Sequence, residues 1–291
     1  MQNHYPGKQP AKISSSVEPI RLKYGSEQLQ FGDLYLPDQS DQYATVVLIH
    51  GGYWRSRYGF DLMNGLAEDL ARRGYAAWNI EYRRVGDLGG GWPGTFQDVA
   101  LATDYVRELA PSYGLDLAKV VPIGHSAGGH LAFWLAARPR IPYFDQNSQI
   151  AGSLVPGKNE ESATPLELAG TISLAGVVDL EMAWRLHLSN DAVVELLGGT
   201  PASVSERYRV ASPAAMLPLG VLQVLIHGTN DDNVPIEVSQ EYVKAARTAG
   251  DKLTYIELEG TDHFDVIDPL SRAWSITIDE LQKLVNLSKG A

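Results

Sequence analysis

The stretch Lys119 to Ala132, KVVPIGHSAGGHLA, decides the fold of this chain. A short β-branched run leads into GHSAG at 124–128, and residues 129–137 have the composition of a helix. This order of strand, tight turn and helix puts Ser126 at the apex of the turn. Glycines two residues before and two residues after it let the strand and the helix approach without Cβ clashes. The pattern predicts a serine hydroxyl above the carboxyl end of a sheet, and a glycine-rich turn with an incidental serine is the alternative.

Strands and helices alternate along the rest of the chain. Continuous apolar runs occur at 44–49, 75–80, 169–174, 221–226 and 253–258, and amphipathic helical patterns occur at 62–73, 95–109, 237–249 and 271–287, with Thr95 as a candidate N-cap. Two alternating segments, 20–24 and 29–36, predict an antiparallel hairpin. Together these patterns predict an α/β fold, with a mostly parallel central sheet, the hairpin at one edge and helices on both faces.

The organisation predicted for the chain is one domain over 17–291 after a polar, flexible tail at 1–16. Two segments interrupt the alternation: 138–166 is polar and proline-rich, and 181–217 predicts short helices. The segment 138–166 is longer than an ordinary connection, which predicts either disorder or a lid. The segment 181–217 lies between predicted strands, which predicts a small helical cap, and we assign both segments to this cap. Pro122 conflicts with a central strand, since proline removes a ladder hydrogen bond.

Composition excludes several classes of function. The formal net charge of -11 argues against a nucleic-acid surface. The chain has no cysteine, which excludes disulfides and thiolate catalysis, and no histidine pair has metal-ligand spacing with a carboxylate. No apolar run reaches the ~20 residues of a membrane span, and the first residues lack the apolar core of a secretory signal. We therefore expect a cytoplasmic protein without a metal or cofactor, and with neither nucleic acid nor membrane as a partner.

The second half of the chain offers the groups that a serine nucleophile needs. A serine hydroxyl requires a base to take its proton, and a third group must orient that base. The run 221–226 ends in HGTNDDNVP at 227–235, and the run 253–258 is followed by EGTDHFD at 259–265. Asp231 and His263 therefore follow two strands at the same edge of the sheet. The order Ser126, Asp231, His263 is the one expected of the α/β-hydrolase arrangement.

Four motifs carry a resemblance to a known family. They are HGGYW at 50–54, GHSAGGH at 124–130, HGTNDDNVP at 227–235 and DHFDVID at 262–268. These motifs resemble those of α/β-hydrolases related to kynurenine formamidase (arylformamidase) and to bacterial esterases of the same branch, over roughly residues 44 to 288. The resemblance implies the α/β-hydrolase fold, with Ser126 as nucleophile, Asp231 as orienting acid and His263 as base. The chain departs from the pattern in the long segment 138–166 and in Asp232, which doubles the acid position.

The resemblance also implies an oxyanion hole made by the backbone N–H groups of Gly52, Tyr53 and Ala127. A simple turn is the alternative for the two glycines. We interpret the other histidines near the motifs as bracing or packing groups, with His227 tethering the Asp231 loop. Three tryptophans in loops or in the cap, Trp54, Trp92 and Trp184, are candidates for a substrate pocket, with core packing as the alternative for each.

The function predicted from the sequence is a serine hydrolase. It cleaves small-molecule carboxylic esters or aryl formamides through the triad and an acyl-enzyme intermediate. A peptidase of the same fold is one alternative, although it would usually carry a larger accessory domain. A non-catalytic binding protein on a hydrolase scaffold is another, although it would typically have lost one of the three groups. The expected partner is a small-molecule ester or amide, and a homodimer is left open.

Overall fold

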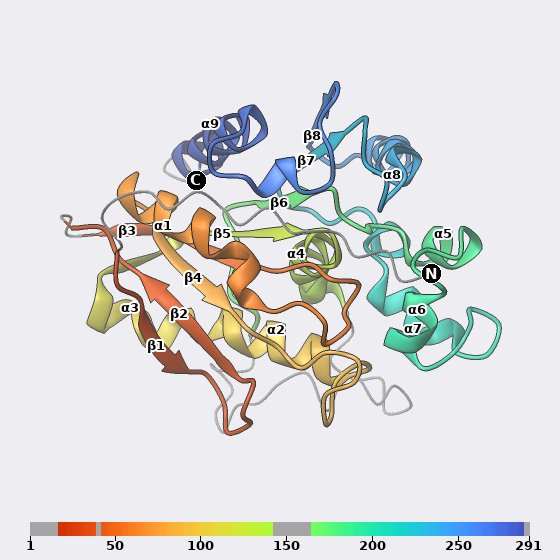
Figure 1. Cartoon of the computed structure of the whole chain (residues 1–291), viewed down its shortest axis with the longest axis horizontal. Helices are drawn as coiled ribbons and strands as arrows, with labels where there is room; N and C mark the ends of the chain where they lie inside the picture. Colours follow the sequence, from red (N-terminus) through yellow and green to blue (C-terminus); the bar gives the residue numbers. More distant parts are fainter. Residues whose placement is uncertain (1–16, 39–41, 142–163, 288–291) are drawn as a thin grey trace.

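The computed structural model describes residues 17–38, 42–141 and 164–287. The predicted tail at 1–16 and most of the segment 138–166 lie outside these residues. The strands are β1 (Ile20–Lys23), β2 (Phe31–Tyr35), β3 (Tyr43–Ile49), β4 (Ala76–Ile80), β5 (Leu115–His125), β6 (Thr171–Leu174), β7 (Gln223–Gly228) and β8 (Leu253–Leu258). Within the described residues they form one sheet in the order β1-β2-β4-β3-β5-β6-β7-β8 (Figure 1).

The predicted fold class is confirmed by the pairing of these strands. β1 pairs antiparallel with β2, and β2 pairs antiparallel with β4, so the N-terminal hairpin forms one edge. The remaining neighbours are parallel. Pro122 pairs with Val47 of β3, whereas the β5–β6 register begins at Ile123. Pro122 therefore lies just before the first residue of β5 that pairs with β6.

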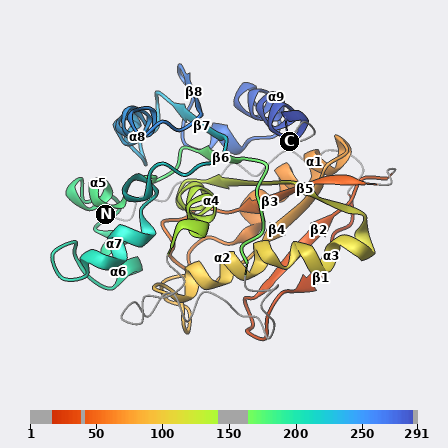
Figure 2. The same cartoon turned by 180° about the vertical axis from the view of Figure 1, so that it is seen from behind.

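Helices cover both faces of the sheet, as Figures 1 and 2 show from opposite sides. One core cluster contains α1 (Asn64–Arg72) and α9 (Arg272–Leu287), and the other contains α2 (Gly94–Asp104), α3 (Val106–Tyr113), α4 (Ala127–Ala137) and α8 (Ile236–Thr248). Short 3-10 helices are η1 (Phe60–Met63), η2 (Arg138–Arg140), η4 (Pro213–Met216) and η5 (Asp265–Ile267). None of the helices in the described ranges is both long enough and apolar enough to span a membrane.

The segment 181–217 contains short helices: α5 (Leu180–Arg185), α6 (Ala192–Leu197), α7 (Ser205–Ala211) and then η4. Asp179 caps α5, because its carboxylate accepts a hydrogen bond from the Met182 N–H at 2.9 Å. These helices bury apolar side chains in the same core cluster as α4. The segment is therefore packed on the body of the protein.

The predicted helix 95–109 is wrong in its boundaries and in its cap. The structure has two helices, α2 and α3, and α3 continues through Pro111 to end at Gly114, whose φ of 66° is left-handed. Thr95 lies inside α2, and Pro93 is the N-cap. The Thr95 hydroxyl donates to the Arg83 carbonyl at 2.5 Å instead. The threonine thus makes a hydrogen bond to a distant part of the chain instead of capping the helix, as its sequence pattern predicted.

Glycines fix the junction between β5 and α4. A Cβ on Gly124 would lie 1.9 Å from the Gly128 carbonyl oxygen, and a Cβ on Gly128 would lie 2.1 Å from the Ile49 carbonyl oxygen. Real Cβ contacts are never this short, so neither position has room for a side chain. The two glycines hold β5, α4 and the end of β3 in direct backbone contact.

Gly128→Ala is therefore expected to destabilise the fold by about 3 kcal/mol, because the added methyl group forces two backbones apart. Urea unfolding, with the midpoint compared at constant m-value, measures the change. Gly74→Ala is the matched control: nothing lies within 4 Å of its Cβ position and its φ is 91°, so only the conformational cost of about 1 kcal/mol applies. Equal losses in the two variants would contradict the close-approach explanation.

Candidate active site

Ser126 occupies the turn between β5 and α4 in a conformation that residues with a Cβ rarely adopt. Its φ is 55° and its ψ is -119°, a strained backbone. The residue exposes only 2% of its surface. Ala127 follows as the first residue of α4, and N–H groups in the first turn of a helix have no partner within it. The turn therefore presents a recessed hydroxyl beside an available backbone donor.

His263 and Asp231 meet across the loops that follow β8 and β7. Nδ1 of His263 lies 2.6 Å from Oδ2 of Asp231. Oδ1 of Asp231 accepts hydrogen bonds from the N–H groups of Asn233 and Val234, both at 2.8 Å. Asp232 is exposed. Of the two adjacent acids, Asp231 is the one that bonds His263.

The surroundings of Asp231 favour its ionised form. Burial raises the pKa of the carboxyl group. Hydrogen bonds from His227, His263 and the Val234 N–H lower it by more, so the pKa of Asp231 lies well below its usual value. An ionised carboxylate accepts the Nδ1–H of His263. Nε2 of His263 is then the nitrogen that can act as a base.

His125, the residue before Ser126, holds the backbone of His263. Its Nε2 lies 2.8 Å from the His263 carbonyl oxygen, and because a carbonyl only accepts, Nε2 carries the hydrogen. The two rings lie 4.5 Å apart between centroids. Burial lowers the pKa of His125 well below its usual value, and the nearby His263 lowers it further. His125 is therefore a neutral donor that connects the serine turn to the His263 loop.

The loop at 50–54 lies against Ser126. A Cβ on Gly51 would come within 3.0 Å of the Ser126 Cβ. The next three residues have positive φ, with 111° at Gly52, 51° at Tyr53 and 58° at Trp54. For a residue with a Cβ this conformation costs roughly 1–2 kcal/mol, so other contacts must hold the loop in place.

Buried side chains provide these contacts. His50 stacks on Tyr82 with ring centroids 4.2 Å apart, and its Nε2 lies 2.9 Å from Oε1 of Glu81. Burial raises the pKa of Glu81, but His50 and other donors lower it below the usual value. Trp54 exposes 1% of its surface, and its Nε1–H donates to Nδ1 of His130 at 3.1 Å. The strained loop is thus anchored at both ends.

Tyr53 joins the 50–54 loop to the Asp231 loop. Its hydroxyl donates to the carbonyl oxygen of Asn233. Burial raises the pKa of Tyr53 to about 12, and Asp231 raises it further, so the phenol stays a donor at neutral pH. Because β5 lies between β3 and β7 in the sheet, this bond connects loops on either side of the Ser126 strand.

Arg55 ties the same loop to the helical segment 181–217. Its Nε lies 2.6 Å from Oε2 of Glu195 in α6, and its Nη1 donates to the Ser189 carbonyl at 2.9 Å. Ser189, Asn190 and Asp191 all have positive φ. Arg55 therefore holds a strained turn of the helical segment next to the 50–54 loop.

The three tryptophans proposed for a substrate pocket have different surroundings. Trp54 lies in the core, as described above, which fits the packing alternative. Trp92 lies edge-on to Phe96 with centroids 5.2 Å apart, and the Arg207 guanidinium lies 5.9 Å from its ring centroid. Trp184 belongs to α5 and is partly buried. A pocket role for Trp92 and Trp184 stays a prediction.

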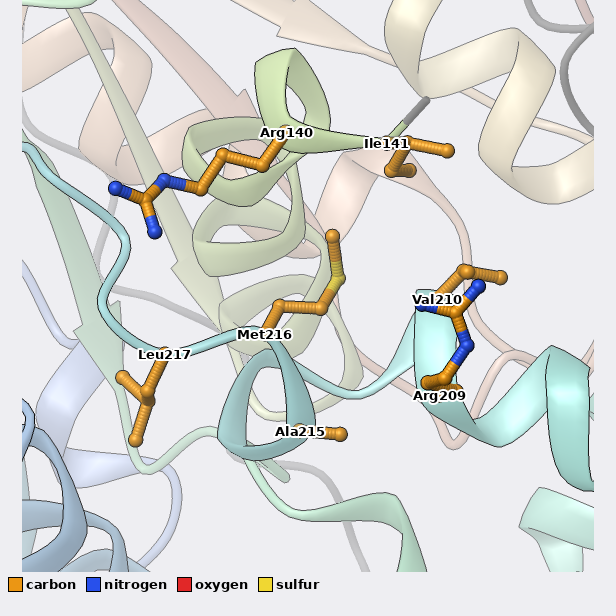
Figure 3. Close-up of a pocket in the computed structure, with 7 residues that line it drawn as sticks. All are labelled: Arg140, Ile141, Arg209, Val210, Ala215, Met216 and Leu217. Atoms are coloured by element: carbon orange, nitrogen blue, oxygen red, sulfur yellow. The ribbon is translucent and has the colours of Figure 1, made fainter. Parts of the chain in front are cut away.

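The cavity in Figure 3 lies away from Ser126. It has a volume of about 160 Å³, and Arg140, Met216 and Leu217 are among the residues that line it. Arg140 lies three residues past Ala137, the last residue of α4, and the 11 residues of that helix span roughly 16 Å. This cavity is therefore separate from the serine turn. Among the residues that the structure describes, no group of three or more histidines, aspartates or glutamates is placed to hold a metal ion.

Two residues of this region were not assigned from the sequence. Glu81 directly follows β4, next to β3 in the sheet, and this position at a strand end could have marked it. Asn233 contributes its carbonyl oxygen to Tyr53, and no side-chain pattern reveals a backbone acceptor.

Comparison with curated proteins agrees with the resemblance seen in the motifs. The chain is 25% identical to the kynurenine formamidase of Danio rerio over 253 residues, which cover 86% of the chain and 75% of that protein. It is 25% identical to Esterase LipC of Mycobacterium tuberculosis over 279 residues, which cover 92% of the chain and 66% of that protein. The predicted resemblance to the formamidase and bacterial esterase branch, and the prediction of a hydrolase enzyme, are confirmed.

A solved structure supports the predicted fold, and a family model matches the sequence. A truncated carbohydrate esterase from gut microbiota superposes with a TM-score of 0.79 at 23% identity, over 96% of this chain and 100% of that one. This likeness confirms the α/β-hydrolase fold. Residues 32–245 match the BD-FAE family. That match spans most of the sequence, and the chain belongs to the BD-FAE family.

Proposed function

We propose that the chain hydrolyses small carboxylic esters through Ser126, His263 and Asp231. One observation carries the proposal: the 2.6 Å contact between Nδ1 of His263 and Oδ2 of Asp231, formed at the sheet edge where Ser126 stands on its strained turn. Nucleophile, base and orienting acid thus come from the loops after β5, β8 and β7. An acid-oriented histidine beside a serine turn is the arrangement that acyl transfer requires.

In the proposed reaction, Nε2 of His263 takes the proton of the Ser126 hydroxyl while Oγ attacks the ester carbonyl. The N–H groups of Gly52, Tyr53 and Ala127 stabilise the negative oxygen of the tetrahedral intermediate. His263 returns the proton to the leaving alcohol, and an acyl-enzyme remains on Ser126. A water molecule activated by His263 then releases the acid and restores the serine.

An aryl formamide is the second candidate substrate, because the same steps cleave an amide when His263 protonates the leaving amine. Its support is the similarity to a kynurenine formamidase. A non-catalytic binding protein is less favoured, since the residues of all three catalytic roles are present. A peptidase of the same fold is less favoured because it would usually carry an accessory domain larger than the helical segment 181–217. The cytoplasmic location and the homodimer stay predictions.

Ser126→Ala is expected to lower kcat by roughly 10⁴- to 10⁶-fold without unfolding the protein. The substitution removes the nucleophile and leaves the glycine contacts of the turn unchanged. Turnover of p-nitrophenyl acetate measures kcat, and a thermal melt checks folding. A fluorophosphonate probe should label the wild type at Ser126 only. Labelling at another residue, or turnover in the variant, would show that the nucleophile lies elsewhere.

Asp231→Asn is expected to lower kcat on the order of 10⁴-fold, because an amide favours the wrong tautomer of the His263 ring. Asp232→Asn is the matched control: it makes the same chemical change one residue away, on an exposed side chain, and should leave kcat near the wild-type value. Steady-state kinetics of the two variants decides the assignment, which is reversed if Asp232→Asn is the more damaging change.

Activity is expected to fall beyond about four to six acyl carbons. Ser126 exposes 2% of its surface and His263 exposes 5%, and the bond from Tyr53 to Asn233 holds the Tyr53 ring beside the Asp231 loop. An open groove would instead gain up to ~0.8 kcal/mol for each buried methylene group. A panel of p-nitrophenyl esters from acetyl to octanoyl, assayed beside N-formylkynurenine, gives kcat/KM for each substrate.

Tyr53→Ala should shift this optimum to longer chains, whereas Tyr53→Phe, which keeps the ring, should shift it less. If octanoyl esters are the best substrates of the wild type, the idea of a confined site is wrong. A clear preference for the formamide over acetyl esters would favour the second candidate substrate.

A further inference from the structure

We propose that His227 and Ser239 are positioning residues that hold the Asp231 carboxylate toward His263. The proposal rests on the proposed function, because its task is to orient the acid of that triad. Neither residue is one of the three proposed catalytic groups. Both act on the side of Asp231 that faces the protein interior.

Two histidine nitrogens approach the same oxygen of Asp231. Oδ2 lies 2.6 Å from Nδ1 of His263 and 3.2 Å from Nε2 of His227. The side chains of Asp231 and His227 are both fully buried, at 0% exposure. In the intact protein, His227 therefore approaches Oδ2 where solvent does not reach it.

The partners of His227 fix which nitrogen carries its hydrogen. Nε2 lies 3.0 Å from the Val234 carbonyl oxygen, and a carbonyl only accepts, so the hydrogen is on Nε2. Nδ1 lies 2.6 Å from Oγ of Ser239, whose hydroxyl can donate to it. The Nε2–H donates to the Val234 carbonyl, and Oδ2 of Asp231 lies 3.2 Å from the same nitrogen.

The same ring ties together the two ends of the Asp231 turn. His227 lies near the end of β7, and Ser239 lies in the first turn of α8. The turn 229–235 connects these two elements, which Figure 1 shows side by side. The backbone donors hold only Oδ1, so removing His227 leaves Oδ2 with His263 as its remaining described donor. The carboxylate then keeps its two bonds on Oδ1 but loses the interior contact that helps to fix Oδ2 in the geometry that His263 requires.

The charge of the site agrees with this geometry. Burial raises the pKa of Asp231, and the hydrogen bond from His227 is the largest contribution that lowers it. His227 therefore supports the ionised carboxylate as well as its orientation.

His227→Leu tests the proposal, because leucine fills much of the ring volume and donates no hydrogen bond. We expect kcat for p-nitrophenyl acetate to fall about 10- to 100-fold, with KM little changed, since a small misplacement of a catalytic group has an effect of this size. His227→Gln, whose amide can reach the position of Nε2, should recover most of kcat. Ser239→Ala should lower kcat by a smaller factor.

A spectroscopic measurement separates positioning from mere structural support. The hydrogen between Nδ1 of His263 and Asp231 should give a low-field proton resonance, and it should shift or broaden in His227→Leu. Tyr242→Phe is the matched control. It removes another buried bond between α8 and β7, from the Tyr242 hydroxyl to Oε1 of Gln223 at 2.7 Å, at the opposite end of β7. It should lower stability and leave kcat and the resonance unchanged.

The proposal is overturned if His227→Leu keeps wild-type kcat, if His227→Gln is no better than His227→Leu, or if Tyr242→Phe loses as much kcat. Should His227→Leu fail to fold, Ser239→Ala decides, and an unchanged kcat and resonance in that variant overturns the proposal. Asp231→Asn distinguishes the proposed function from the positioning role. If Asp231→Asn keeps its activity, the proposed function is wrong. If Asp231→Asn loses activity while His227→Leu keeps it, only the positioning role is wrong.

Discussion

The contact between β5 and α4 leaves no space for a methyl group at Gly124 or Gly128, and the rest of the site depends on this contact. A Cβ on Gly128 would lie 2.1 Å from the Ile49 carbonyl oxygen, so the serine turn is pressed against the end of β3 as well as against α4. Ser126 has its positive φ because the chain must reverse from strand to helix within this space. The 50–54 loop, which continues from β3, is brought beside Ser126 by the same contact.

Buried polar side chains fix the loops around this junction, and their partners come from other parts of the fold. His50 bonds Glu81 at the end of β4, and His227 bonds Ser239 of α8. An unpaired polar group in such a position would cost roughly 1–3 kcal/mol, so each pair specifies one arrangement of its loop. Within the described residues, Nδ1 of His125 has no hydrogen-bond partner, and the ring is held by the bond that its Nε2–H makes to His263.

The fold and the positions of the motifs could be predicted from the sequence, because apolar runs mark buried parallel strands and the residues after such strands lie at one edge of the sheet. Asp231 and His263 could be placed there for this reason. The contacts that hold the edge together could not be predicted, since Tyr53 and Asn233 are 180 residues apart and one of the two groups is a backbone carbonyl. Local signals also misled where tertiary contacts competed, as with Thr95, whose hydroxyl bonds the Arg83 carbonyl instead of capping a helix.

The strain in the 50–54 loop suggests how folding free energy is used at this edge. Tyr53 and Trp54 have positive φ although neither is glycine, and the loop keeps this conformation because both side chains are held: Trp54 by His130 and Tyr53 by Asn233. Backbone donors stabilise a developing negative charge best when they are already oriented before the reaction. A glycine at either position would adopt the same φ without strain, but it would lack the side chain that fixes it. If the N–H groups of this loop act as the proposed oxyanion donors, the free-energy cost of orienting them falls on folding, through long-range contacts that join the loops on both sides of Ser126.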